Sequence, residues 1–192
     1  MGNTLLIGSC EPFSGKSALV LGLARHLLSE GRTVRFGKPL ATSLEWTAKG
    51  SPLPDPLIDD DVRFVGTTLG IDESRLIPSL HLLSPETADT RLRQGNLDAG
   101  TGLEMLLNDL QNDQDSFTML EAAGSLHEGL MYGLSLVQLA QGLDAPVILV
   151  HLWQDSRSVD ALLAAQHQLG DRLAGVVLNA VTPDEVEELN QH

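Results

Sequence analysis

One short stretch near the N-terminus constrains the fold more than any other part of the chain. Apolar residues 5–7 lead into a loop of small residues that ends on Gly15-Lys16-Ser17, and a helical pattern follows. A strand, a small-residue loop and a helix in this order are the layout of a phosphate-binding loop, in which backbone amides and the helix dipole face a bound phosphate. The sequence therefore predicts a nucleotide site here.

Residues 8–17, the phosphate loop, carry side chains suited to this task. Gly15 lets the backbone approach a phosphate, and the first helix amides, up to Ala18, point toward it. Lys16 is expected to reach the β- and γ-phosphates, and Ser17 to hold Mg²⁺. The strict pattern has glycine five positions before Gly15, where this chain has Cys10, so we expect a longer loop of different shape. The alternative interpretation is a strand–turn–helix corner with a surface lysine.

The overall charge narrows the range of partners. The 192-residue chain carries a formal net charge of −14, which opposes nucleic acid and anionic membranes because both are bound largely through Lys and Arg. No apolar run reaches the roughly 18 residues of a membrane span, and the N-terminus lacks the basic start of a secretion signal. We therefore expect a cytoplasmic protein with a single domain over residues 1–192.

The cysteine and histidine content predicts neither a disulfide nor a zinc framework. The chain has one cysteine, Cys10, which excludes an internal disulfide. Its six histidines are scattered, with no His-x-x-x-His or Cys-x-x-Cys spacing. A structural zinc site is therefore not expected from local spacing.

Strand and helix patterns alternate along the chain. Short apolar runs predict strands, and amphipathic segments between them predict helices. The expected strands are 4–7, 33–37, 117–120, 145–150 and 175–178, and the expected helices are 16–30, 62–69, 84–95, 103–112, 134–142, 156–169 and a last one beginning at 182. This alternation predicts an α/β fold of P-loop NTPase-like type, with a mostly parallel sheet and helices on both faces.

A second candidate site residue follows the second expected strand. Lys38 begins a short segment at the carboxyl end of that strand, on the same edge of the sheet as the phosphate loop. Ligands bind along that edge in open α/β sheets. Lys38 is therefore a candidate ligand-binding residue, and the alternative is a solvated loop lysine.

Candidate metal ligands occur in two places. Asp59-Asp60-Asp61 open an expected helix, where acids favour the helix dipole, so helix capping is a sufficient explanation. The functional alternative is Mg²⁺ binding, directly or through water, with Asp61 the preferred residue. Glu121 ends a buried strand, where it is placed to hold a metal bound to a nucleotide, and the alternative is a solvated strand-end acid. The loop after it, which includes Glu128, is long and polar enough to hold a second ligand.

Four separated motifs together resemble the dethiobiotin synthetase-like branch of P-loop ATPases. They are Gly15-Lys16-Ser17, Lys38-Pro39-Leu40-Ala41-Thr42, Leu120-Glu121-Ala122-Ala123-Gly124 and Val177-Leu178-Asn179-Ala180-Val181-Thr182-Pro183. They occur in the family's order and at its spacing, and they span almost the whole chain. Residues 11–17, Glu-Pro-Phe-Ser-Gly-Lys-Ser, are similar also to the N-terminal domains of phosphotransacetylase-like proteins that carry a DRTGG module.

In dethiobiotin synthetase, a substrate amine captures CO₂ as a carbamate, ATP phosphorylates that carbamate, and a second amine closes the ring. The resemblance implies ATP and Mg²⁺ as cofactors and a small carboxylate or amine as substrate. It implies two catalytic lysines, with Lys16 neutralising phosphate and Lys38 lying between the γ-phosphate and the carbamate. The other implied contacts are ATP contacts for Gly15, Lys16, Ser17, Ala18 and Asn179, the last at the adenine edge, substrate contacts for Thr42 and Gly124, and Mg²⁺ contacts for Ser17, Asp61 and Glu121.

The chain departs from the synthetase pattern in three ways. The phosphate loop is one residue longer, with Pro12-Phe13 in place of smaller residues. The loop after Glu121 has less glycine, and the chain ends soon after Pro183, whereas the family continues through another strand. Two interpretations stay open: a fragment that lacks a C-terminal strand or domain, and a trimmed relative.

Three functions compete at this point. The first is an ATP- and Mg²⁺-dependent ligase, like the synthetase or the cobyrinate amidoligases. The second is a nucleotide-binding or non-catalytic regulatory module that acts through a protein partner. The third, a small-molecule kinase with Arg91 and Arg93 as a lid, ranks low because it leaves the Lys38-Pro39 motif unexplained. The family places substrate sites at a two-fold interface, so the resemblance also implies a homodimer.

Overall fold

The computed structural model describes residues 3–44, 52–95, 97, 100–113 and 115–189. Its strands are β1 (Thr4–Ser9), β2 (Val34–Gly37), β3 (Leu40–Ala41), β4 (Leu76–Ile77), β5 (His81–Leu82), β6 (Phe117–Glu121), β7 (Val147–Leu152) and β8 (Leu173–Asn179). Six of them form one sheet in the order β4-β2-β6-β1-β7-β8, and β3 pairs with β5 in a separate two-stranded sheet. Every pairing is parallel, which confirms the predicted parallel sheet.

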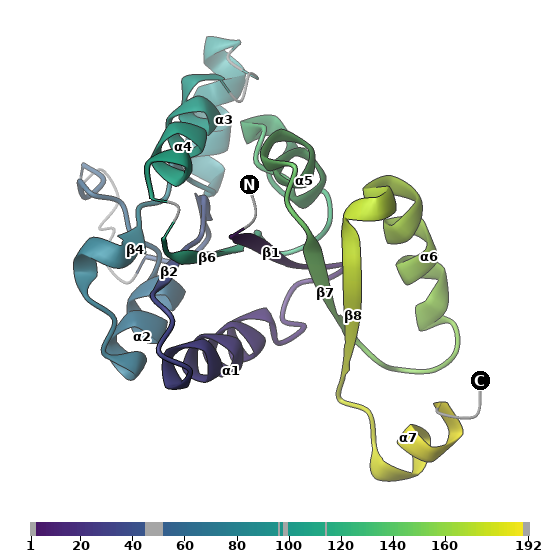
Figure 1. The fold of residues 1–192 in the computed structure, drawn as a ribbon. Coiled ribbons are helices and arrows are strands. Elements are labelled where there is room, and N and C mark those ends of the chain that lie inside the picture. The colour runs from purple at the N-terminus through teal and green to yellow at the C-terminus, as the bar shows by residue number, and fades with distance from the viewer. Residues whose placement is uncertain (1–2, 45–51, 96, 98–99, 114, 190–192) are drawn as a thin grey trace.

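Helices follow the strands and cover both faces of the sheet. They are α1 (Lys16–Ser29), α2 (Asp60–Leu69), α3 (Pro85–Gln94), α4 (Gly100–Asn112), α5 (Leu136–Leu143), α6 (Ser158–Leu169) and α7 (Pro183–Leu189), with short 3-10 helices at Glu73–Arg75, Leu130–Tyr132 and Gly170–Arg172. Side chains of α1 and α2 pack on one face, and those of α4, α5 and α6 pack on the other (Figure 1). The predicted α/β class, with helices on both faces, is confirmed.

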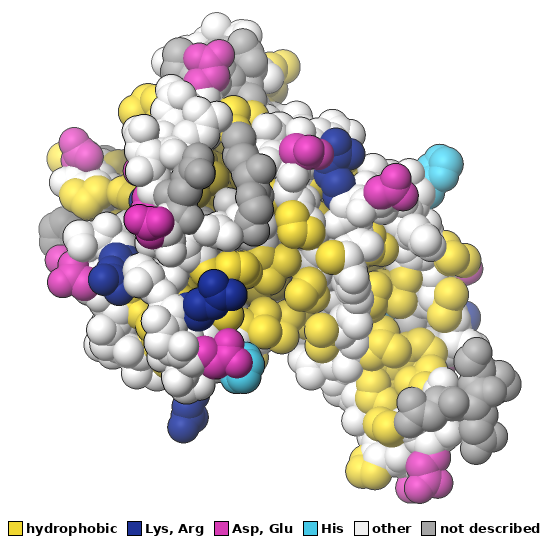
Figure 2. Space-filling model, viewed as in Figure 1, with side chains coloured by type: hydrophobic (Ala, Val, Ile, Leu, Met, Phe, Trp, Pro, Cys, Tyr) yellow, Lys and Arg dark blue, Asp and Glu magenta, His cyan; other side chains and the backbone are white. Residues whose placement is uncertain are grey.

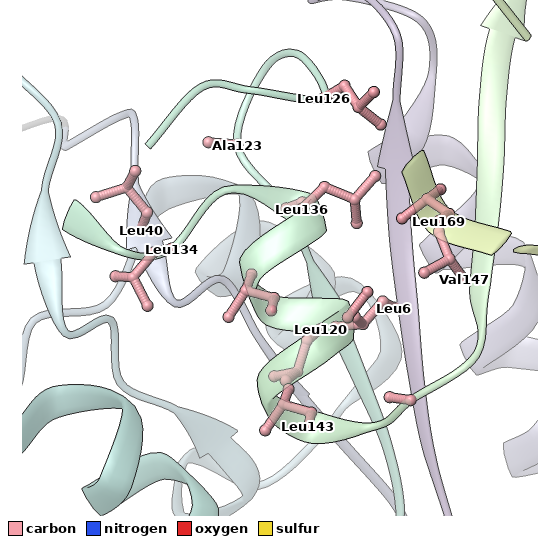
Figure 3. Close-up of a cluster of buried hydrophobic side chains, with 14 of the residues drawn as sticks. Leu6, Leu40, Leu120, Ala123, Leu126, Leu134, Leu136, Leu143, Val147 and Leu169 are labelled. Carbon is pink, nitrogen blue, oxygen red and sulfur yellow. The ribbon is translucent and has the colours of Figure 1, made fainter. Parts of the chain in front are cut away.

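The sheet lies between two hydrophobic clusters. In β1, Leu6 belongs to the cluster beneath α5, whereas its neighbour Ile7 belongs to the cluster beneath α1, because successive side chains of a strand point to opposite faces. Figure 3 shows the first cluster, in which Leu136 and Leu143 of α5 pack against Leu6 and its neighbours. A central strand buried on both faces explains why its sequence is apolar without alternation.

Two features differ from the sequence-based expectation. The edge strand β4 and the pair β3–β5 were not predicted, because strands of two residues are too short to show a period. Helix α6 begins at Ser158 and not at Ser156 as expected, with Arg157 in the N-cap position and no side-chain capping bond. The expected helix 103–112 is present as α4, and its Leu106 and Leu110 are buried in the core.

Part of the molecular surface is apolar. Figure 2 shows hydrophobic side chains gathered between α1 and the part of the chain formed by β8 and α7. Val176 and Val177 of the edge strand are 40% and 36% exposed, and Val186 of α7 is 45% exposed. Among the described residues, no helix combines the length and the apolar character that crossing a bilayer requires.

Candidate functional site

A pocket of about 920 Å³ opens at the carboxyl edge of the sheet. Its wall comes from the phosphate loop, the segment after β2, the start of α2, the end of β6 and the start of α3. The structure brings nine of the ten predicted site residues into this wall: Gly15, Lys16, Ser17, Ala18, Lys38, Thr42, Asp61, Glu121 and Gly124. Residues more than a hundred positions apart in the sequence therefore share one site.

The phosphate loop has the backbone geometry that close approach requires. Gly15 is the N-cap of α1 and adopts a left-handed conformation, with φ of 100°. A side chain there would collide with the amide of Asn179, so only glycine fits this position. Phe13 also has positive φ and is 95% exposed at the tip of the loop. The extra residue predicted from the sequence thus forms a projecting turn.

Asn179 holds the phosphate loop from outside the pocket. Its Nδ2 donates a hydrogen bond of 2.8 Å to the carbonyl oxygen of Ser14, and its Oδ1 accepts one from the amide of Ala180. Asn179 is the one predicted site residue that does not line the pocket wall. Its contact with the adenine edge stays a prediction.

Lys16 is buried at the base of the pocket. Its Nζ donates hydrogen bonds to Oγ of Ser9, at 3.0 Å, and to the carbonyl oxygen of Gly124, at 3.1 Å. Burial lowers the pKa of this ammonium group, and nearby Glu121 opposes that shift. The bonds to Ser9 and Gly124 hold the side chain at the base of the pocket, and its contact with phosphate stays a prediction.

Glu121 is the most deeply buried carboxylate that faces the pocket. Its Oε1 accepts a hydrogen bond of 3.2 Å from Oγ of Ser17, and its Oε2 has no hydrogen-bond partner among the described residues. Burial raises the pKa of Glu121 to about 7, although Lys38 and Lys16 act in the opposite direction. An orphaned carboxylate oxygen beside a serine hydroxyl is a donor set suited to Mg²⁺, which prefers oxygen ligands.

Lys38 is buried and paired with acids from the start of α2. Its Nζ lies 2.8 Å from Oδ2 of Asp61 and 3.3 Å from Oδ2 of Asp59, and it donates a 2.6 Å hydrogen bond to Oγ1 of Thr42. Burial lowers the pKa of Lys38, but the carboxylates of Asp59, Asp61 and Glu121 outweigh it, and the pKa lies above its ordinary value. The alternative of a solvated loop lysine is wrong.

Sequence reasoning missed the role of Asp59. This fully buried carboxylate accepts hydrogen bonds from the amides of Thr42, Ser43 and Asp61, at 2.7, 3.1 and 2.9 Å. It is the N-cap of α2, so the capping interpretation of the acidic run is confirmed for Asp59. Its second role, pairing with Lys38, had no local sequence signal because the two lie 21 positions apart. Metal binding by Asp61, whose carboxylate contacts Lys38, stays a prediction.

Two further elements shape the pocket. Glu128 faces it from the loop after β6, close enough that a side chain at Gly124 would collide with its carboxylate. The start of α3 forms another part of the wall, and its arginines point elsewhere: Arg91 is buried, with its guanidinium 4.7 Å from the ring centroid of Tyr132. Neither Arg91 nor Arg93 lines this pocket, which removes the structural basis for an arginine lid.

The chain also matches known proteins. The profile of the AAA domain family AAA_26 matches residues 3–192. The chain belongs to this family. It is 28% identical over 172 residues to the ATP-dependent dethiobiotin synthetase BioD of Pseudomonas aeruginosa, a match that covers 88% of this chain and 73% of that protein. The resemblance to dethiobiotin synthetase-like P-loop ATPases expected from the motifs is confirmed.

Solved structures support the fold alone. The kinase domain of Escherichia coli tyrosine kinase ETK is 14% identical, with a TM-score of 0.54 over 93% of this chain and 68% of that one. The signal recognition particle receptor FtsY from Elizabethkingia anophelis is 15% identical, with a TM-score of 0.50, and the match covers 93% of this chain and 49% of the receptor chain. At these identities the likeness confirms the P-loop NTPase-like fold and says nothing about substrates.

The raised pKa of Glu121 gives a prediction for the metal-free protein. Between pH 4.5, the ordinary pKa, and about 7, the folded protein holds a proton that the unfolded chain releases. The free energy of unfolding therefore falls as pH rises from 4.5 to about 7. Above that range the destabilisation caused by this carboxylate is constant. We expect Glu121→Gln to be more stable than wild type by about 1–3 kcal/mol near pH 8, and nearly equal to it at pH 4.5, in urea unfolding with chelator.

The exposed Glu104 provides the control for this measurement. Glu104→Gln should leave the difference from wild type the same at both pH values. A Glu121→Gln variant that is less stable than wild type near pH 8 would contradict the raised pKa.

Proposed function

We propose that this protein is an Mg²⁺-dependent, ATP-consuming enzyme of the ligase type, which activates a carboxylate or carbamate by phosphoryl transfer. The observation that carries the proposal is the meeting of Lys16, Lys38 and Glu121 in one pocket. A domain that folds in this way but binds no ligand has no need to bury two lysines and an acid together, because each buried charge costs free energy unless it is paired. Family membership and the match to BioD support the same activity class.

The proposed mechanism divides the chemistry between the two lysines. Lys16 and the first amides of α1 hold the β- and γ-phosphates, and Lys38 lies where the γ-phosphate meets the acceptor. An oxygen of the acceptor carboxylate or carbamate attacks the γ-phosphorus, the bond from that phosphorus to the bridging oxygen breaks, and ADP leaves. A substrate amine then attacks the acyl carbon and expels phosphate. Such transfer depends on positioning and charge neutralisation more than on a covalent protein group.

Ser17 and Glu121 are the proposed Mg²⁺ ligands, with Asp61 joining them. When bound, the metal neutralises charge on the β- and γ-phosphate oxygens. In the structure Asp61 is engaged by Lys38 at 2.8 Å. A γ-phosphate that attracts Lys38 would compete with this contact and leave the Asp61 carboxylate available to the metal. The same residue could thereby restrain Lys38 before ATP binds and serve the metal afterwards.

The part of the pocket beyond Lys38 is the proposed substrate region. Thr42, the backbone of Gly124 and the carboxylate of Glu128 line it. A polar wall with both a hydroxyl and a carboxylate suits a small molecule bearing an amine and an acid group. We propose Thr42 and Gly124 as substrate contacts, and a cytoplasmic homodimer as the working form.

A regulatory, nucleotide-binding module is the second candidate. The projecting turn with Phe13 at its tip favours it, since residues 11–17 are similar to the N-terminal domains of phosphotransacetylase-like proteins. Such a module would bind nucleotide, use Lys16 for affinity and act on a protein partner without consuming ATP. The two functions therefore differ in turnover and in their demand on Lys38.

The proposed metal role of Glu121 predicts how ATP affinity depends on Mg²⁺. Glu121→Gln should weaken binding of Mg·ATP by about 10-fold or more, the usual scale for losing a group that orders a metal site. Binding of ATP in chelator should not weaken, because without a metal the carboxylate of Glu121 repels phosphate and its loss removes that repulsion. Calorimetric titration with and without Mg²⁺ measures both, with Glu104→Gln as control. An equal effect on the two affinities would exclude the metal role.

The proposed role of Lys38 predicts a separation of binding from turnover. Lys38→Ala should leave ADP affinity within about 3-fold of wild type, while ATP consumption with an acceptor falls by at least about 100-fold, as expected for loss of a transition-state charge contact. Lys38→Arg keeps the charge and tests whether geometry matters. A large loss of ADP affinity in Lys38→Ala would instead make Lys38 a general nucleotide contact.

A further inference from the structure

A second group of side chains that could bind a metal ion lies at the start of the phosphate loop, outside the nucleotide pocket. Cys10 and Glu11 belong to the loop, and His151 belongs to β7, 140 residues away along the chain. One ligand atom from each lies within 4.8 Å of the other two. None of these three residues lines the nucleotide pocket, so the cluster is independent of the proposed Mg²⁺ ligands.

The atoms of the cluster face one another without completing each other's hydrogen bonds. Nδ1 of His151 lies 2.8 Å from Oε2 of Glu11, and this buried nitrogen forms no hydrogen bond among the described residues. Oε1 of Glu11 accepts a 2.7 Å hydrogen bond from the amide of Leu152. The carboxylate is thus held in place by one oxygen while the other points at the imidazole.

Cys10 is the third member of the group. Its Sγ donates a hydrogen bond of 3.7 Å to the carbonyl oxygen of Ala161 in α6. Burial, assisted by Glu11, raises the pKa of this thiol to about 11, so without a metal it is a protonated, unreactive group. A lone buried cysteine needs no further explanation, but here it adjoins a histidine and a carboxylate.

We propose that Cys10, Glu11 and His151 bind a thiophilic divalent metal ion of the Zn²⁺ type, which clips the phosphate loop to β7. Thiolate, imidazole and carboxylate are the donors that zinc takes at about 2.0–2.3 Å, with a fourth position open to water. Such distances put ligand atoms about 3.3–3.8 Å apart in a tetrahedral site. The 2.8 Å contact between Glu11 and His151 therefore needs to open slightly, and separations of up to 4.8 Å within the cluster need to close by roughly 1 Å. The partly exposed Glu11 gives access from solvent.

Cobalt is the probe that tests this site, because Co²⁺ takes zinc ligands and its complexes with thiolate absorb in the near ultraviolet. Cys10 is the one cysteine of the chain, so any sulfur-to-cobalt band reports this residue. The wild-type chain should develop the band with one equivalent of Co²⁺ and lose it when Zn²⁺ is added. Gel filtration during the titration should show no metal-dependent increase in size, since all three ligands come from one chain.

Variants distinguish a metal site with three ligands from metal binding by the Cys10 thiol alone. Cys10→Ser should remove the band, and Glu11→Gln and His151→Gln should each weaken Co²⁺ binding by at least about 10–100-fold, the range seen even for outer-shell partners. His81→Gln, which alters a half-buried histidine elsewhere, is the matched control and should bind as wild type does. Absence of the band in the wild-type chain, or its retention in both Glu11→Gln and His151→Gln, would overturn the proposal.

Discussion

The parallel register of the central strands is the constraint on which the site depends. Ile7 of β1 pairs with Glu121 of β6, and Gly37 of β2 pairs with Leu120. Because parallel strands end on one edge of the sheet, the phosphate loop after β1, Lys38 after β2 and Glu121 at the end of β6 must meet there. A shift of one residue in β6 would turn Glu121 to the other face of the sheet.

Burial of the Lys38 charge at this edge is tolerable because neighbouring carboxylates offset it. Lys38 faces Asp59 and Asp61, and Lys16 lies near Glu121. Removing the carboxylate of Asp59 would leave Lys38 less compensated, and an uncompensated buried ion typically costs several kcal/mol. Glu121 differs, because its raised pKa shows that burial still disfavours its ionised form. Under the proposed function, a ligand that brings both negative phosphate and a positive metal ion would preserve this balance of charge.

The sequence predicted the parts of the fold that show a hydrophobic period or a recognisable sequence motif. Strand, loop and helix around Lys16 were evident because apolar runs and glycine have direct backbone consequences, and Lys38 and Glu121 were evident from their places after strands. Asp59 was not identified as the partner of Lys38, since long-range ion pairs have no local signature. The proximity of Cys10 to His151 was invisible for the same reason, because it exists only once β1 and β7 pair.

The central claim is that the phosphate loop is a working nucleotide site, and calorimetric titration of ATP with Mg²⁺ tests it most directly. We predict binding to the wild-type chain that Lys16→Ala weakens by at least about 100-fold, because the lysine supplies a buried charge-assisted contact to phosphate. Arg32→Ala, which removes an exposed cation beyond the end of α1, should bind as wild type does. Equal binding by wild type and Lys16→Ala, or no binding by either, would contradict the claim.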